Sequence, residues 1–253
     1  MLRSYLDGAV FGTSTGEGPP RALLLHGWRR THQDFRAVAD ALAASGVASV
    51  ALDLAGFGAT PPPPEAMGAR GYAQALEPLL AEMARAGPVV LVGHSFGGRV
   101  ATCLAARRPD AVDGLVLAGV PLVRSAMPAG RPSRRYQAVR ALARWHLVSQ
   151  GRLERARRRH GSEDYRAATG VVRGVLVASI AESYEDELAR LRCPVALVWG
   201  SLDMTVPLEV ARAAEPLVAA CSLEVLEGVG HLVPTEDPAA IAAATLELVG
   251  AER

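Results

Sequence analysis

Residues 89–99 are VVLVGHSFGGR, and they place a serine at an abrupt change of secondary structure. The first four residues form an apolar run typical of a strand that is buried on both faces. Helical spacing begins directly after Ser95, and Gly93 and Gly97 lack the side chains that would collide in so tight a turn. The stretch therefore predicts a strand–turn–helix unit. It lifts the Ser95 hydroxyl above the end of a sheet, at the positive end of the following helix.

Similar apolar runs recur along the chain and alternate with amphipathic stretches of helical spacing. The predicted strands span residues 21–26, 48–54, 89–93, 115–118, 195–200 and 223–226. The predicted helices span residues 34–44, 71–86, 97–107, 208–220 and 238–249, with Asp237 as the N-cap of the last. This alternation predicts an α/β fold with a doubly wound, mostly parallel sheet and helices on both faces. The residues up to Gly18 are expected to add a hairpin at the sheet edge.

One segment departs from this alternation. Residues 122–188 contain no convincing strand, and long helical patterns such as 136–148 dominate. An excursion of this length is too long for a loop, so it predicts a helical cap over the carboxyl ends of the strands, where ligands bind in such sheets. The expected organisation is an α/β core of residues 1–121 and 189–253 with the cap inserted between them.

Composition excludes several broad classes of function. The 253 residues carry a net charge of +1, which argues against a general nucleic-acid or membrane-surface binder. No apolar run approaches the roughly 20 residues that a membrane-spanning helix needs. The first residues lack the long apolar stretch of a signal peptide. We therefore expect a cytoplasmic protein that acts on a small molecule, without nucleic-acid or membrane partners.

A serine is a poor nucleophile at neutral pH, so Ser95 needs a base within hydrogen-bond reach and a third group that orients the base. His231 is the predicted base because it lies in a glycine-rich loop, EGVGHLVP (residues 227–234), directly after the last predicted strand. Other histidines fit less well. His32, His146 and His160 are expected to be solvated, and His94 to point elsewhere on the turn.

The acid that orients the base should follow the carboxyl end of an earlier strand. The strand at 195–200 is followed by a loop in which Asp203 is the one carboxylate, whereas the loop after residues 115–118 offers none. The order Ser95, Asp203, His231 is also the chain order of nucleophile-elbow hydrolases. A carboxylate that merely caps the next helix is the alternative interpretation of Asp203.

Two backbone N–H groups are the usual stabilisers of the oxyanion that forms in acyl transfer, and one donor is worth roughly 3 kcal/mol. The amide of Phe96, next to the nucleophile, is the first predicted donor. The second is the amide of Trp28, because Gly27 lets the loop after the strand at 21–26 approach the site. A plain strand-ending turn is the alternative at His26 and Gly27.

With these pieces in place, the chain resembles the α/β-hydrolase family along essentially its whole length. The matching segments are HGW (residues 26–28), DLAGFG (53–58), the turn at 93–98, GSLD (200–203) and GH (230–231). The resemblance implies an eight-stranded, mostly parallel sheet with a cap and an acyl-enzyme mechanism that needs no metal or cofactor. It implies a structural role for Asp53. The family's carboxylate-nucleophile members carry aspartate where this chain has Ser95, which disfavours their chemistries.

Several functions are compatible with this set of residues. The first is a carboxylesterase-like serine hydrolase that cleaves esters, or lactones and thioesters, through an acyl-enzyme on Ser95. The second is a carbon–carbon bond hydrolase or lyase that acts on a carboxylated substrate with the same triad. The third is a ligand-binding or receptor-type homologue with weak turnover.

Arginine content bears on the choice between these functions. Residues 124–173 hold thirteen arginines against three acidic residues, a net charge of +10 that leaves −9 on the remainder. Such a cap could attract anionic substrates, but a solvated helical face is the favoured interpretation, because arginines around a helix point in too many directions to converge on one ligand. Arg99, just after the serine turn, resembles a residue of a carboxylate-eliminating lyase of this fold.

Overall fold

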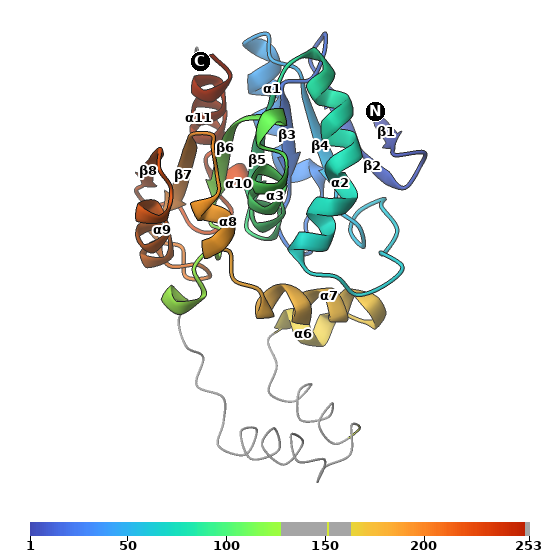
Figure 1. The fold of residues 1–253 in the computed structure, drawn as a ribbon, viewed down its shortest axis with the longest axis vertical. Helices are drawn as coiled ribbons and strands as arrows, with labels where there is room; N and C mark the ends of the chain where they lie inside the picture. The colour runs from blue at the N-terminus through green and yellow to red at the C-terminus, as the bar shows by residue number, and fades with distance from the viewer. Residues whose placement is uncertain (128–150, 152–162, 251–253) are drawn as a thin grey trace.

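Eight strands of the described part of the chain form one sheet in the order β1-β2-β4-β3-β5-β6-β7-β8 (Figure 1). The structure is a computed structural model that describes residues 1–127, 151 and 163–250. The strands are β1 (Leu2–Tyr5), β2 (Val10–Thr15), β3 (Ala22–Leu25), β4 (Ser49–Asp53), β5 (Val89–His94), β6 (Val112–Ala118), β7 (Val195–Gly200) and β8 (Cys221–Leu226). Along the sheet from β4 to β8 all neighbours are parallel. At the other edge β1 pairs antiparallel with β2, and β2 pairs antiparallel with β4.

Helices cover both faces of this sheet. The helices are η1 (His32–Phe35), α1 (Arg36–Ala44), α2 (Ala69–Met83), η2 (Ala84–Ala86), α3 (Phe96–Arg107), η3 (Pro109–Ala111), η4 (Arg124–Ala126), α6 (Glu163–Ala167), α7 (Gly170–Ala181), α8 (Glu185–Ala189), α9 (Leu208–Ala214), η5 (Glu215–Leu217), α10 (Val233–Glu236) and α11 (Pro238–Gly250). Apolar side chains of α2, α3 and α9 pack on one face, and those of α1 and α11 pack on the other.

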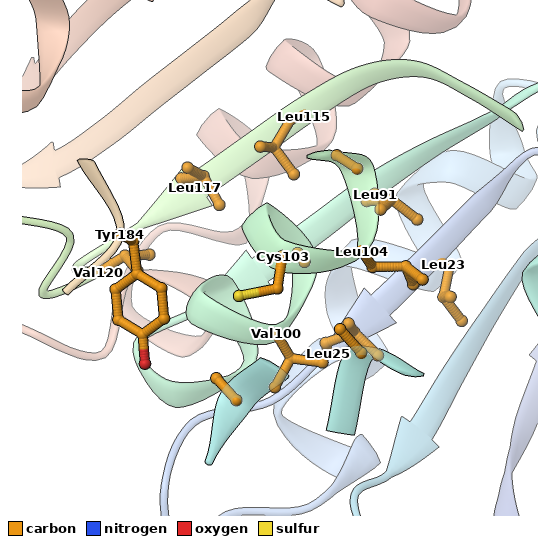
Figure 2. Packing of buried hydrophobic residues seen from close by; sticks show 14 of the residues in the cluster. Leu23, Leu25, Leu91, Val100, Cys103, Leu104, Leu115, Leu117, Val120 and Tyr184 are labelled. Atoms are coloured by element: carbon orange, nitrogen blue, oxygen red, sulfur yellow. The ribbon is translucent and has the colours of Figure 1, made fainter. Parts of the chain in front are cut away.

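Strand β5 shows why a continuous apolar run is needed in the centre of the sheet. Successive side chains of a strand point to opposite faces. Leu91 accordingly packs in the cluster beneath α2 and α3, whereas Val90 and Val92 pack beneath α1 and α11. Figure 2 shows Val100 and Leu104 of α3 beside the leucines of β3, β5 and β6. This packing fixes the strand that directly precedes Ser95.

The fold predicted from the sequence is confirmed. All six predicted strands and five predicted helices are present, and the first residues form the expected β1–β2 hairpin. Helix α11 begins at Pro238, and the Asp237 carboxylate accepts a hydrogen bond from the Ala240 amide at 3.1 Å, as an N-cap does.

The predicted cap, residues 122–188, lies partly outside the described residues, and the helical pattern at 136–148 lies wholly outside them. In its described part, helices α6 and α7 lie at one end of the molecule, near the start of α2 (Figure 1). The Glu182 carboxylate accepts a hydrogen bond from the Ala69 amide at the first residue of α2, at 2.8 Å. A cap domain therefore stays a proposal.

Across residues 1–127 and 163–250, the structure contains no helix that is both long enough and apolar enough to cross a bilayer.

Candidate active site

The turn after β5 holds Ser95 in a strained backbone conformation. Strand β5 ends at His94, α3 begins at Phe96, and Ser95 between them has φ 50° and ψ −110°. A non-glycine residue in such a region costs about 1–3 kcal/mol, which the surrounding structure has to offset. The Ser95 amide donates to the carbonyl of Ala118 on β6 at 2.9 Å. A Cβ on Gly97 would overlap the carbonyl oxygen of Leu25, so only glycine fits there.

The structure brings the hydroxyl of Ser95, the imidazole of His231 and the carboxylate of Asp203 into one line. The Ser95 Oγ lies 3.2 Å from His231 Nε2, and His231 Nδ1 lies 2.7 Å from Asp203 Oδ2. A carboxylate only accepts, so Nδ1 carries the proton and the lone pair of Nε2 faces the serine hydroxyl. That is the tautomer in which an imidazole can take the proton of a hydroxyl.

The carboxylate oxygen of Asp203 that does not face His231 is also held by hydrogen bonds. This oxygen, Oδ1, accepts hydrogen bonds from the amides of Thr205 and Val206, both at 2.8 Å. The Asp203 side chain has no exposed surface, and the His231 side chain is 18% exposed. The buried carboxylate is therefore fully paired, as a buried charge must be. The aspartate therefore binds the imidazole through one oxygen as well as two backbone amides through the other, so it is more than a helix cap.

The loops that carry the acid and the base are bonded to each other. The Leu202 amide donates to the Val229 carbonyl at 2.9 Å, and the Ser201 amide donates to the Leu226 carbonyl at 2.9 Å. The Gly228 amide donates to the Ser201 hydroxyl at 3.0 Å. Because β7 and β8 are parallel neighbours, their carboxyl ends bring these loops together at the edge of the sheet where β5 delivers Ser95.

The two residues whose amides are the predicted oxyanion donors pack against each other through their side chains. The rings of Trp28 and Phe96 pack edge to face, with centroids 5.5 Å apart. Phe96 is the first residue of α3, so its N–H has no partner within the helix. A Cβ on Gly27 would lie 2.7 Å from Nδ1 of His94 and 3.4 Å from Cβ of Ser95, so the backbone before Trp28 approaches the serine closely. The amides of Trp28 and Phe96 remain the candidate donors.

Two histidines differ from expectation. His32 is not solvated: its Nδ1 lies 2.8 Å from Oδ1 of the buried Asp53, and its side chain is only 17% exposed. This pair anchors the segment after β3 to the end of β4, consistent with a structural role for Asp53. His146 and His160 lie outside the described residues.

His94 does not point away from the site. Its ring centroid is 4.9 Å from that of His231, and its Nε2 lies 2.8 Å from the His231 carbonyl oxygen. Burial, helped by the nearby imidazole of His231, lowers the pKa of His94 to about 4, so the ring is neutral at pH 7. No local sequence signal could reveal this contact, because its partners are 137 residues apart.

Arg99 lies one turn after Ser95 and is half-buried. Its Nη1 donates to the carbonyl of Ser179 on α7 at 3.0 Å, and its guanidinium lies 5.8 Å from the Tyr184 ring centroid. The residue therefore links α3 to the described part of the predicted cap.

Within residues 1–127 and 163–250, no group of three or more His, Cys, Asp or Glu side chains is arranged to hold a metal ion.

Known proteins resemble this chain in sequence and in structure. The pimeloyl-[acyl-carrier protein] methyl ester esterase of Chromobacterium violaceum is 29% identical over 225 residues, which cover 80% of this chain and 83% of that protein. An esterase from Thermogutta terrifontis has a TM-score of 0.68 at 23% identity, over 96% of this chain and 94% of that one. A serine hydrolase involved in carbazole degradation has a TM-score of 0.71 at 21% identity, over 98% of both chains.

The two structural likenesses show the fold alone, but the sequence profile of one family covers most of the chain. The profile of the Alpha/beta hydrolase family matches residues 22–244, from the start of β3 into the last helix. The matched region includes every residue of the candidate site. The resemblance predicted from the sequence is thus confirmed, and the chain belongs to the Alpha/beta hydrolase family.

Proposed function

We propose that this protein is a serine hydrolase that cleaves carboxylic esters through an acyl-enzyme on Ser95. The observation that carries the proposal is the line from Ser95 Oγ through His231 to Asp203, with contacts of 3.2 and 2.7 Å. Both distances lie within or close to the reach expected of a nucleophile, its base and the group that orients the base. The sequence relative from Chromobacterium violaceum, which is named a methyl ester esterase, supports the same reaction class.

The first half of the reaction transfers the acyl group to the protein. The lone pair of His231 Nε2 accepts the Ser95 proton while the serine oxygen bonds to the ester carbonyl carbon. Negative charge then forms on the carbonyl oxygen, which the amides of Trp28 and Phe96 stabilise. Collapse of this intermediate breaks the bond to the alcohol oxygen, which takes the proton from His231 and leaves.

The second half releases the acid. Water gives a proton to His231 Nε2 and its oxygen attacks the acyl carbon, so that the oxyanion forms again at the same two amides. When the bond to Ser95 breaks, the serine oxygen recovers its proton from His231. Throughout the cycle Asp203 keeps its hydrogen bond to Nδ1 and stabilises the positive charge that His231 carries in each intermediate.

The experiment is hydrolysis of short-chain p-nitrophenyl esters by the wild-type protein and by Ser95→Ala. We expect Ser95→Ala to lower kcat by about 10⁵- to 10⁶-fold, because the nucleophile and its base act as a unit. Ser45→Ala is the matched control, since Ser45 is exposed at the end of α1, and we expect wild-type rates from it. Wild-type rates from Ser95→Ala would refute the proposal.

A wider substrate panel separates the other reaction classes. Lactones and thioesters test the breadth of acyl transfer, and vinylogous diketo acids test carbon–carbon bond cleavage. Carbon–carbon bond cleavage of a carboxylated substrate needs a cation that binds the substrate carboxylate. Arg99, the arginine nearest to Ser95 in sequence, already donates to the carbonyl of Ser179. Tight binding of an anionic metabolite without turnover would instead favour the ligand-binding homologue.

A further inference from the structure

The backbone on either side of His231 is held by a carboxylate from α10, the short helix that follows this histidine. Glu236, the last residue of α10, accepts a hydrogen bond from the Gly230 amide through Oε2 at 2.6 Å. It also accepts one from the Leu232 amide through Oε1 at 2.9 Å. These two amides immediately precede and follow the candidate base. One exposed side chain thus joins both flanking peptides and fixes the curvature of the loop.

The carbonyl of His231 itself is held from the opposite direction. His94, the last residue of β5 and the neighbour of Ser95, is buried and 2% exposed. Its Nε2 is 2.8 Å from the His231 carbonyl oxygen, and because a carbonyl only accepts, Nε2 carries the proton and donates. The bond joins the strand that delivers the nucleophile to the peptide that delivers the base.

We propose that His94 and Glu236 are positioning residues that together fix the backbone of His231, so that its imidazole stays in line with Ser95. This inference rests on the proposed function. It extends that function because neither residue belongs to the triad or to the oxyanion donors. Glu236 sets the shape of the loop, and His94 sets the distance between the loop and the nucleophile.

The demands on the imidazole explain why its backbone needs this support. Nδ1 must stay 2.7 Å from Asp203 while Nε2 stays 3.2 Å from Ser95, and both contacts depend on where the His231 backbone lies. The loop that carries Asp203 also restrains the chain just before His231, because the Leu202 amide donates to the carbonyl of Val229, two residues before the histidine. A displacement of about 1 Å at such a site costs about 100-fold in rate.

The neutral state of His94 suits this role. A neutral imidazole has one N–H donor and one acceptor, and here the donor is committed to the His231 carbonyl. Nδ1 of His94 is buried and has no hydrogen-bond partner among the described residues. A neutral ring also avoids charge repulsion with His231 when that imidazole takes the serine proton, at a centroid separation of 4.9 Å.

The test for His94 compares two replacements of similar size. His94→Phe keeps a ring but removes the donor, and His94→Gln places an amide N–H near the position of Nε2. We expect His94→Phe to lower kcat by about 10- to 100-fold with KM unchanged, and His94→Gln to recover most of that loss. Equal kcat values for both variants would overturn the assignment.

The test for Glu236 uses an exposed residue, so loss of folding does not confuse the result. We expect Glu236→Ala to lower kcat about tenfold at constant KM, and Glu236→Gln, which keeps one acceptor oxygen, to lie between it and the wild type. Glu227→Ala is the matched control, an exposed glutamate of the same loop, and should keep the wild-type kcat. A kcat for Glu236→Ala within twofold of wild type would overturn the role of Glu236.

A spectroscopic readout distinguishes positioning from general stability. The proton between His231 Nδ1 and Asp203 should give a downfield proton resonance, which we expect to broaden or disappear in His94→Phe and Glu236→Ala and to persist in Glu227→Ala. A wild-type protein that shows this resonance but cleaves no ester would contradict the proposed function and leave the positioning roles supported by the spectra. An unchanged resonance in both variants would refute positioning even if ester cleavage is confirmed.

Discussion

Replacing Asp203 with asparagine keeps the shape of the side chain but reverses one hydrogen bond at the candidate site. Oδ1 of Asp203 accepts hydrogen bonds from the amides of Thr205 and Val206, so the oxygen of an asparagine would take that position. Its NH₂ group would then face His231 Nδ1 and donate to it. The ring proton would move to Nε2, which faces Ser95 and could no longer accept the serine proton.

The wrong tautomer removes general-base catalysis without removing the fold or the substrate site. We expect Asp203→Asn to lower kcat by about 10⁴-fold, which corresponds to about 5 kcal/mol of transition-state stabilisation. The value of KM should change little, since no substrate contact is lost. Initial rates with a p-nitrophenyl ester measure the effect, and thermal unfolding of the same samples checks the fold. A folded variant within tenfold of the wild-type kcat would refute this account of Asp203.

Three further outcomes follow from the contacts described above. His94 has a pKa of about 4 in the folded protein against an ordinary 6.5, so between these pH values the unfolded chain binds more protons than the folded protein. Titration of His94 should therefore lower the free energy of unfolding by about 3 kcal/mol as the pH falls from 6.5 to 4. Urea unfolding measured across this pH range should show that His94→Phe lacks this contribution. In Gly27→Ala the new Cβ atom would push against His94 and Ser95 and displace the backbone before Trp28, so kcat should fall by about 10- to 100-fold while the unfolding temperature stays near the wild-type value. An unchanged kcat would show that the loop of the predicted oxyanion donor tolerates this displacement. Arg70, whose side chain is 44% exposed, donates two hydrogen bonds to the buried carboxylate of Glu187, at 2.7 and 2.9 Å. Arg70→Met leaves that carboxylate without this partner, so it should lower the free energy of unfolding by about 2 kcal/mol at unchanged kcat. Wild-type stability of Arg70→Met in urea would contradict this.

The central part of the fold was predictable because burial leaves a clear pattern in the chain. A strand that lies in a parallel sheet between two helical layers must be apolar on both faces, as residues 89–92 are. The exact ends were less predictable. Strand β6 begins at Val112 rather than near Leu115, since the polar Asp113 lies within the strand while its carboxylate binds Arg21 at 3.1 Å.

The candidate site was predictable for a topological reason. In a parallel sheet the loops that follow the strands lie at one edge, so the loops after β5, β7 and β8 had to meet. Each of those loops offers one residue of the right chemistry, which singled out Ser95, Asp203 and His231.

The contacts around the site were not predictable, because they join positions whose spacing carries no pattern. His94 reaches a carbonyl that is 137 residues away, and His32 reaches Asp53 across 21 residues. Glu236 is near His231 in sequence, yet nothing in the local composition shows that its carboxylate turns back to two amides. Ten of the thirteen arginines of residues 124–173 lie outside the described residues, so the role of the predicted cap in substrate choice stays a prediction.

The most direct test is to trap the nucleophile with a fluorophosphonate and locate the adduct by mass spectrometry. The reagent mimics an ester and stops at the covalent stage. We expect one phosphonyl group per chain, found on Ser95, formed far more slowly in His231→Ala and absent from Ser95→Ala. Two results would contradict the account: a wild-type protein that hydrolyses esters while its adduct lies on another residue, or an adduct that forms as fast in His231→Ala as in the wild type.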